Sequence, residues 1–206
     1  MERSLGLFLL QVAGISLTGV MMPGPVTAGT IAKGYSDRNA GALIAVGHAI
    51  IEIPLIAAIY LGFGHFFGPP QAVKAIHIVG GLMLFYLGFR MFRTAGNAVG
   101  DIGGLPTSSL VTGIVLTGTN PGFYVWWMTI GMALIASATD FGFSGIVLLA
   151  LVHWPCDLAW YEFLSVGTFK SRKWWTQKVQ RIVFSVCASM LVGFGVYFCI
   201  KAFTGV

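Results

Sequence analysis

The sequence predicts an all-α membrane protein with six transmembrane helices, arranged as two inverted three-helix repeats whose first and fourth helices are broken. Its composition is the first observation, since 56% of the 206 residues are hydrophobic and only 9% are charged, whereas soluble domains are about 25% charged. The second observation is that the sequence contains six apolar stretches of about 20 residues, each long enough to cross a bilayer. The third is a pair of motifs that occurs twice in the same order.

The six predicted spans follow one another with little sequence between them. Charged or turn-forming residues separate them, and the Gly-rich segment 94–108 is typical of a flexible linker. Residues 1–28 share features with a secretory signal, but their apolar run is long for one. The spans are residues 5–31, 40–65, 71–92, 109–137, 142–167 and 180–203. We therefore expect a first repeat in 1–93, a cytoplasmic linker in 94–108 and a second repeat in 109–206.

Basic residues are distributed unevenly between the two sides of the predicted bundle. Nine lie in or beside the connections after spans one, three and five, and three lie on the opposite side. The nine are Lys33, Arg38, Arg90, Arg93, Lys170, Arg172, Lys173, Lys178 and Arg181, and the three are Arg3, Lys74 and Lys201. Because cytoplasmic loops of membrane proteins carry the excess of Lys and Arg, this pattern predicts that both termini are extracytoplasmic.

A Pro-Gly pair lies inside the first span and another inside the fourth. These pairs are Pro23-Gly24 in MMPGPVTAGT and Pro121-Gly122 in GTNPGFYVWW. Proline lacks a backbone N–H and clashes with the preceding turn, so we expect each helix to break there. Broken membrane helices expose backbone groups with partial charges that bind ions and polar substrates. Beside the breaks lie Pro25 and two neutral hydrogen-bonding candidates, Thr27 and Asn120.

A histidine and an acid four residues apart lie deep inside the second and fifth spans. The pairs are His48 with Glu52 and His153 with Asp157. Residues four apart share one face of a helix, and a carboxylate at the centre of a membrane helix costs about 2.5–3.5 kcal/mol on insertion scales. Such groups face the bundle interior and mark substrate or proton pathways. We expect both pairs to line one cavity that binds a zwitterion, with the substrate ammonium at an acid and its carboxylate at exposed backbone N–H groups.

The order of these motifs indicates how the two halves are related. Each half has a Pro-Gly break followed one span later by a His-x-x-x-acid pair, and a unit of three spans must reverse its orientation when it is repeated. This is the inverted-repeat plan of many secondary transporters. The sequence therefore predicts a secondary-active membrane transporter of a small amine-bearing molecule.

Other functions are less compatible with the sequence. The net charge of +5 comes from basic residues at span ends, so we expect no nucleic-acid partner. The chain has no Cys-x-x-Cys pair, no His-Glu-x-x-His motif and no nucleotide-binding loop, so we expect neither an enzyme nor a cofactor. One alternative stays open, a transporter of divalent or heavy-metal cations, because imidazole, thiolate and carboxylate all bind metals. Its candidate ligands are His48, Glu52, His153, Cys156 and Asp157.

Four segments resemble the lysine-exporter (LysE-type) translocator family. They are PGPVTAGTIAKG, GALIAVGHAIIE, GGLMLFYLGFRMFR and TGIVLTGTNPGFYVWWM, and the likeness covers nearly the whole chain. The matching site positions are Pro23, Gly24, Pro25, Asn120 and Pro121. The resemblance implies a six-span inner-membrane exporter of amino acids, coupled to protons or other ions and often dimeric. Many members have Asp or Asn where this chain has Val26, so the resemblance does not identify lysine as the substrate.

The sequence thus predicts small-molecule substrate and membrane lipid as partners, together with a possible homodimer. Small residues in the third span, Gly80, Gly81 and Gly88, would allow close helix packing either between two copies or within one.

Overall fold

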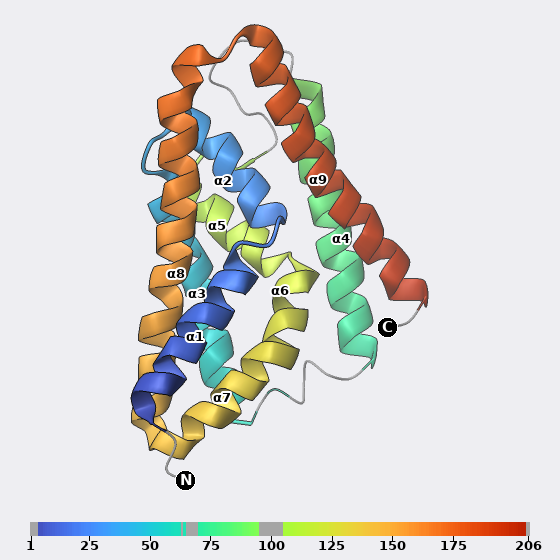
Figure 1. The fold of residues 1–206 in the computed structure, drawn as a ribbon. Helices are drawn as coiled ribbons and strands as arrows, with labels where there is room; N and C mark the ends of the chain where they lie inside the picture. Colours follow the sequence, from blue (N-terminus) through green and yellow to red (C-terminus); the bar gives the residue numbers. More distant parts are fainter. Residues whose placement is uncertain (1–3, 63, 65–69, 95–104, 205–206) are drawn as a thin grey trace.

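The computed structural model describes residues 4–62, 64, 70–94 and 105–204, and these are helical nearly throughout, with no strand among them (Figure 1). The α-helices are α1 (Leu5–Val20), α2 (Pro25–Ser36), α3 (Ala40–Tyr60), α4 (Pro70–Thr94), α5 (Ser109–Gly118), α6 (Pro121–Trp126), α7 (Met132–Ala138), α8 (Gly142–Ser171) and α9 (Gln177–Thr204). A π-helix, η2 (Trp127–Gly131), joins α6 to α7, and the 3-10 turns η3 (Thr139–Phe141) and η4 (Arg172–Trp174) flank α8. The all-α prediction is confirmed. Most of the predicted linker, residues 95–104, lies outside the described residues.

The described chain has fewer separate membrane-length helical runs than the six predicted spans. By length and apolar composition, four helical runs of the described chain can cross a membrane, or five if the bent pair α1 and α2 forms one span. One of the four is the run Pro121–Trp174. Within it the backbone turns at Gly142, whose φ of +64° favours glycine, and α7 and α8 run in opposite directions (Figure 1). Six spans related as inverted repeats therefore remain a prediction.

Both predicted helix breaks are present. Helix α1 ends at Val20 and α2 begins at Pro25, and the two helices are bent by 73°. In the second half α5 ends at Gly118 and α6 begins at Pro121. A proline at the first position of a helix loses no hydrogen bond, because the N–H there has no partner within the helix. Pro23-Gly24 thus directly precedes the start of α2, and Pro121-Gly122 begins α6.

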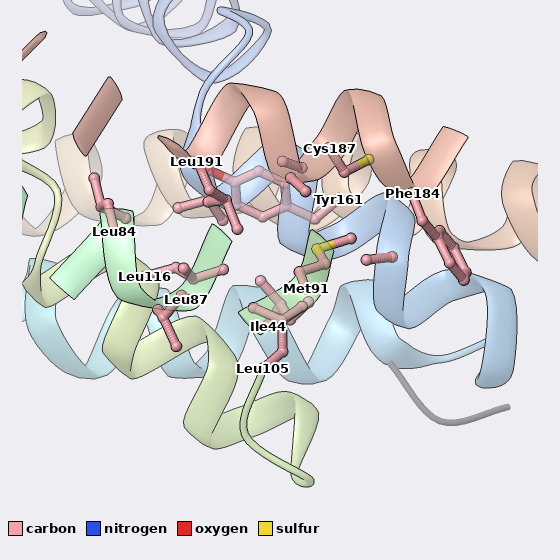
Figure 2. Close-up of a cluster of buried hydrophobic side chains, with 14 of the residues drawn as sticks. Ile44, Leu84, Leu87, Met91, Leu105, Leu116, Tyr161, Phe184, Cys187 and Leu191 are labelled. Carbon is pink, nitrogen blue, oxygen red and sulfur yellow. The ribbon is translucent and has the colours of Figure 1, made fainter. Parts of the chain in front are cut away.

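The buried apolar side chains form two separate clusters. The first, shown in Figure 2, joins α4 and α9 to α3, α5 and α8. Among its members are Leu84, Met91, Leu116 and Leu191. The second joins α1, α3, α7 and α8 around Trp127 and also includes Phe8, Val12, Leu55 and Leu134. Helices α3 and α8 contribute to both clusters and so connect the two parts of the molecule.

Glycines allow α3 to approach its neighbours closely. A Cβ atom at Gly41 would overlap the backbone carbonyl of Tyr161 on α8. On the other side of α3, Gly47 faces the backbone of α5, and Gly113 of α5 faces Ile44. Any larger side chain would push these helices apart, so the glycines hold α3 between α5 and α8.

The glycines of α4 pack within the protomer. Gly81 and Gly88 meet residues of α9, and Gly80 meets Thr119 and Pro121 at the break between α5 and α6. These small residues therefore allow close packing of helices within one chain. They do not support the homodimer, which stays a prediction.

Candidate functional site

Helices α3 and α8 bring the two histidines and two acids together between the apolar clusters. On α3, Ile44 belongs to the first cluster and Leu55 to the second, and the His48–Glu52 pair lies between them in sequence. On α8 the order is reversed, with Leu149 in the second cluster and Tyr161 in the first. All four side chains are buried, with exposed fractions of 6% for His48, 1% for Glu52, 3% for His153 and 1% for Asp157.

One carboxylate oxygen, Oε1 of Glu52, is the centre of this group. The Nε2 atoms of His48 and His153 each lie 3.0 Å from it, and the indole Nε1–H of Trp127 donates to it over 3.2 Å. Three N–H donors around one oxygen fit an ionised carboxylate, which accepts hydrogen bonds only. Glu52 is therefore tied to α3, α8 and η2 at once.

The second nitrogen of His153 fixes the hydrogen-bond pattern of that ring. Its Nδ1 lies 2.7 Å from Oγ of Ser16, and this hydroxyl donates to the carbonyl of Val12 over 2.6 Å. A hydroxyl has only one hydrogen, so Ser16 accepts from Nδ1–H. With Nε2–H on Glu52, His153 donates from both nitrogens, which is the pattern of the protonated imidazole.

His48 also has a hydroxyl and Glu52 as partners, but its hydrogen-bond pattern is less constrained. Its Nδ1 lies 2.8 Å from Oγ1 of Thr117 on α5. The threonine hydroxyl can donate to this nitrogen or accept from it, so the geometry fits either the neutral or the protonated ring. His48 and His153 thus occupy equivalent places beside Glu52 but differ in how strongly their protonation is constrained.

Asp157 is the acid with a vacant hydrogen-bonding position. Its Oδ1 lies 3.8 Å from Nε2 of His48, and its Oδ2 lies 3.5 Å from Nε2 of His153. Among the described residues, Oδ2 is buried and has no hydrogen-bond partner. A buried carboxylate oxygen without a partner is costly, and it is suited to accept a donor that a ligand supplies.

A cavity of about 650 Å³ connects this group with both helix breaks. All four histidine and acid residues line it, as do the α1–α2 break and the start of α6. The predicted break residues on its wall are Pro23, Gly24, Pro25, Thr27, Asn120 and Gly122. Aromatic residues of α6 and α9, together with Lys201 near the end of α9, form much of the remaining wall. Sequence motifs from both halves therefore meet at one cavity.

The two helix starts at this cavity differ in capping. Helix α2 begins after Gly24, and no described side chain caps its first backbone N–H groups. Helix α6 begins after Asn120, whose Oδ1 accepts from the N–H of Gly122 over 3.0 Å. The side chain predicted as a substrate contact, Asn120, thus serves its own helix. Thr27 donates to the carbonyl of Met22 over 3.3 Å.

Three residues that complete the network were absent from the sequence prediction. Ser16, Thr117 and Trp127 contact the histidines and Glu52 from α1, α5 and η2. Serine and threonine are ordinary residues of membrane helices, so neither carries a signal by itself. The pair Trp126-Trp127, a few residues after the Pro121-Gly122 pair, is a signal that could have indicated this region, and both rings pack against His153, with centroids 5.6 and 5.2 Å away.

Part of the predicted metal-ligand set is also assembled. Potential ligand atoms of His48, Glu52 and Asp157 lie within 4.8 Å of one another. Cys156 does not belong to this group, and its Sγ lies 3.4 Å from the carbonyl of Val152, one turn earlier in α8. A mixed imidazole and carboxylate group can hold a divalent cation without the thiol.

Comparison with protein families gives one result. The family model described as "LysE type translocator" matches residues 17–202, from the second half of α1 nearly to the end of α9. The matched region contains every residue that lines the cavity, and Ser16 of the hydrogen-bond network lies one residue before it. The comparisons with curated proteins and with solved structures find no match.

Proposed function

The chain belongs to the LysE-type translocator family, and on that premise we propose that it is a secondary-active exporter of an amino acid or a similar small amine-bearing metabolite, coupled to protons. Membership in this family implies membrane transport of amino acids or similar molecules rather than enzymatic catalysis. The observation that carries the finer proposal is the cavity that joins two buried acids to an uncapped helix start.

The cavity offers separate partners to the two charges of an amino acid. The substrate carboxylate binds at the start of α2, where free backbone N–H groups and the positive end of the helix dipole favour an anion, and Lys201 adds a positive charge to the same cavity. The substrate ammonium binds at Asp157, whose Oδ2 has no other described donor. The sequence did not distinguish the two breaks or the two acids as substrate contacts. This assignment selects the α2 break for the carboxylate and Asp157 for the ammonium.

Proton coupling follows from the crowding of four ionisable groups. An ammonium beside Asp157 adds positive charge to a group that already contains two histidines. Loss of a proton from this group would compensate the added charge, so substrate binding and proton release become linked. His48, whose partners fit either protonation state, is the group that releases and rebinds this proton.

The test is transport in proteoliposomes under an imposed pH gradient. The wild-type protein is expected to accumulate a labelled amino acid against its gradient and to move protons in the opposite direction. Glu52→Gln should insert and fold but lose proton-coupled transport, because Gln keeps the shape of the side chain and removes its charge. Wild-type transport by a Glu52→Gln/Asp157→Asn double variant would show that the acids are structural and would overturn the proposed site.

The membrane arrangement is part of the same proposal. The chain crosses the inner membrane six times as two inverted repeats, with both termini extracytoplasmic, and the support is the excess of basic residues beside alternate connections. Single cysteines at Ser36 and Ser171, introduced after replacement of the three native cysteines, should resist an impermeant thiol reagent added to intact cells. A cysteine at Thr204 should react. The reverse labelling pattern would invert the orientation.

Transport of a divalent cation is the second candidate, because His48, Glu52 and Asp157 are assembled as possible ligands. The two functions differ in their dependence on imidazole. If a metal ion is the substrate, His48→Ala should be as damaging as Glu52→Gln, and zinc or manganese should be transported without any amino acid. If an amino acid is the substrate, His48→Ala should lose proton coupling but retain measurable downhill transport of the amino acid, and metal ions should not be carried.

A further inference from the structure

We infer that the transported molecule is a zwitterion with a bulky apolar side chain, branched or aromatic, and that Trp126, packed against Gly19, limits the size of that side chain. This inference rests on the proposed function and names the substrate class of the same cavity. The inference is based on the chemistry of the cavity wall and on the close contact between Gly19 and Trp126.

The acids of the cavity lie together at one place. Glu52 and Asp157 are the only described acidic residues that line it, and the same two histidines lie within 4 Å of both. A dibasic substrate such as lysine carries a second ammonium several bonds away from the first. No second carboxylate is placed to receive it, and a buried charge without a partner is strongly unfavourable. A neutral side chain avoids this cost.

The rest of the wall is largely apolar. Helix α9 contributes Phe194, Tyr197 and Phe198. Val20 at the end of α1 and Val125 in α6 also line the cavity. Val26, which follows Pro-Gly-Pro, also lines the cavity. A wall of this kind binds apolar surface and rings, and it offers few hydrogen bonds to a polar side chain.

Trp126 is held in position on three sides. Its ring lies 5.6 Å from that of His153 and 5.2 Å, edge to face, from that of Trp127. On the side of α1 it rests on Gly19, where an added Cβ atom would lie 2.9 Å from Cε2 and Nε1 of the indole. A methyl group there forces the ring or α1 to shift, and since Gly19 and Trp126 both line the cavity, the added methyl group takes space from a bound side chain.

Helix α1 contains a matched control. A Cβ atom at Gly14 would meet nothing within 4 Å, so Gly14→Ala makes the same chemical change in the same helix without touching Trp126. Both substitutions replace a helical glycine of α1 by alanine, the better helix former. A difference between the two variants therefore reports the contact with Trp126.

The experiment measures export of leucine, phenylalanine, tryptophan, alanine and lysine by full-length protein in proteoliposomes. Rates are expressed relative to alanine within each preparation, so that a loss of folded protein cancels. One methylene in an apolar pocket is worth about 10- to 200-fold in selectivity. We expect the wild-type protein to prefer leucine or phenylalanine to alanine and lysine by at least about 10-fold.

The variants then test the role of Trp126. Gly19→Ala should reduce the ratio of phenylalanine and tryptophan to alanine about 10-fold, Trp126→Phe should raise the ratio for tryptophan, and Gly14→Ala should change neither. Equal rates for lysine and phenylalanine would overturn the substrate class. Unchanged ratios in both Gly19→Ala and Trp126→Phe would overturn the role of Trp126. Failure to transport any amino acid would overturn the proposed function itself.

Discussion

The two halves of the chain carry the same pair of motifs but leave different groups open. In the first half the acid is satisfied, because Glu52 accepts three N–H donors, whereas the helix start at Gly24 has no side-chain cap among the described residues. In the second half the helix start is capped by Asn120, whereas Oδ2 of Asp157 has no described partner.

The difference shows how one repeated pattern produces an asymmetric site. Each half contributes one open group to the shared cavity, a helix start suited to an anion and a carboxylate suited to a cation. Of the other two groups, Glu52 holds the two histidines beside Asp157, and Asn120 caps α6. A zwitterion needs one partner of each kind, so two identical half-sites would serve it less well than these two unequal ones.

The largest expected effects are those of the two acids. Substitution of either acid should reduce transport, but only substitution of Glu52 should reduce the stability of the fold. Glu52→Gln and Asp157→Asn should each reduce transport about 100-fold or more, since both remove charge from the cavity group. Glu52→Gln should also lower the free energy of unfolding by about 1–3 kcal/mol, because it weakens charge-assisted bonds to three buried donors. Asp157→Asn should not lower it. Thermal unfolding in detergent beside transport assays makes the comparison, and an equal loss of stability would contradict it.

A smaller effect is expected at the two helix starts. Gly24 has an extended backbone that any residue can adopt, and a Cβ atom there would make only an ordinary contact. Gly24→Ser should cap α2 and compete with the substrate carboxylate, so KM should rise about 10-fold without loss of stability. Asn120→Ala should instead cost about 1 kcal/mol of stability and leave KM nearly unchanged. A rise of KM in Asn120→Ala alone would reverse the assignment.

The smallest effect on transport is expected at the hydroxyl groups behind the histidines. Ser16→Ala removes the acceptor of the His153 Nδ1–H and leaves a buried donor unpaired, at a cost of about 1–3 kcal/mol. Thr117→Val removes the partner of His48, whose ring can adopt the neutral form without that hydrogen. We therefore expect Ser16→Ala to lower both the unfolding temperature and the transport rate more than Thr117→Val. A larger effect of Thr117→Val would show that His48 is the more constrained ring.

The helical fold and the centre of the site followed from simple features of the sequence. Apolar runs indicated the helices, Pro23 and Pro121 indicated the breaks, and Glu52 and Asp157 were conspicuous because buried charge in apolar sequence is costly. What could not be predicted depends on contacts between distant residues. Nothing near Ser16 in sequence shows that its hydroxyl meets His153, and the capping of α6 by Asn120 depends on backbone geometry at the break.

The limits of hydrophobicity as a guide are clearest at the turns. Residues 109–137 were predicted as one span broken at Pro121-Gly122, but the part after the break is divided again into α6, a π-helix and α7. All of these are apolar, so composition does not mark where one ends and the next begins. Pro54 and Pro155, in contrast, lie inside α3 and α8 without ending them. Pro23 and Pro121, each followed by a glycine, lie at interruptions, whereas Pro54 and Pro155 do not.

The π-helix between α6 and α7 has a consequence for the phase of that whole segment. A π-helical turn holds one residue more than an α-helical turn, and in an α-helix each residue advances the side-chain direction by about 100°. The inserted turn lets Trp127 face Glu52 while Leu134 and Ile135, farther along, face the second apolar cluster. Deleting a single residue from Trp127–Gly131 would bring the helix back to uniform α-helical winding. Either Trp127 would then turn away from Glu52, or Leu134 and Ile135 would turn away from the second cluster. The segment is therefore a spacer whose length, more than its composition, sets the alignment of the site with the core.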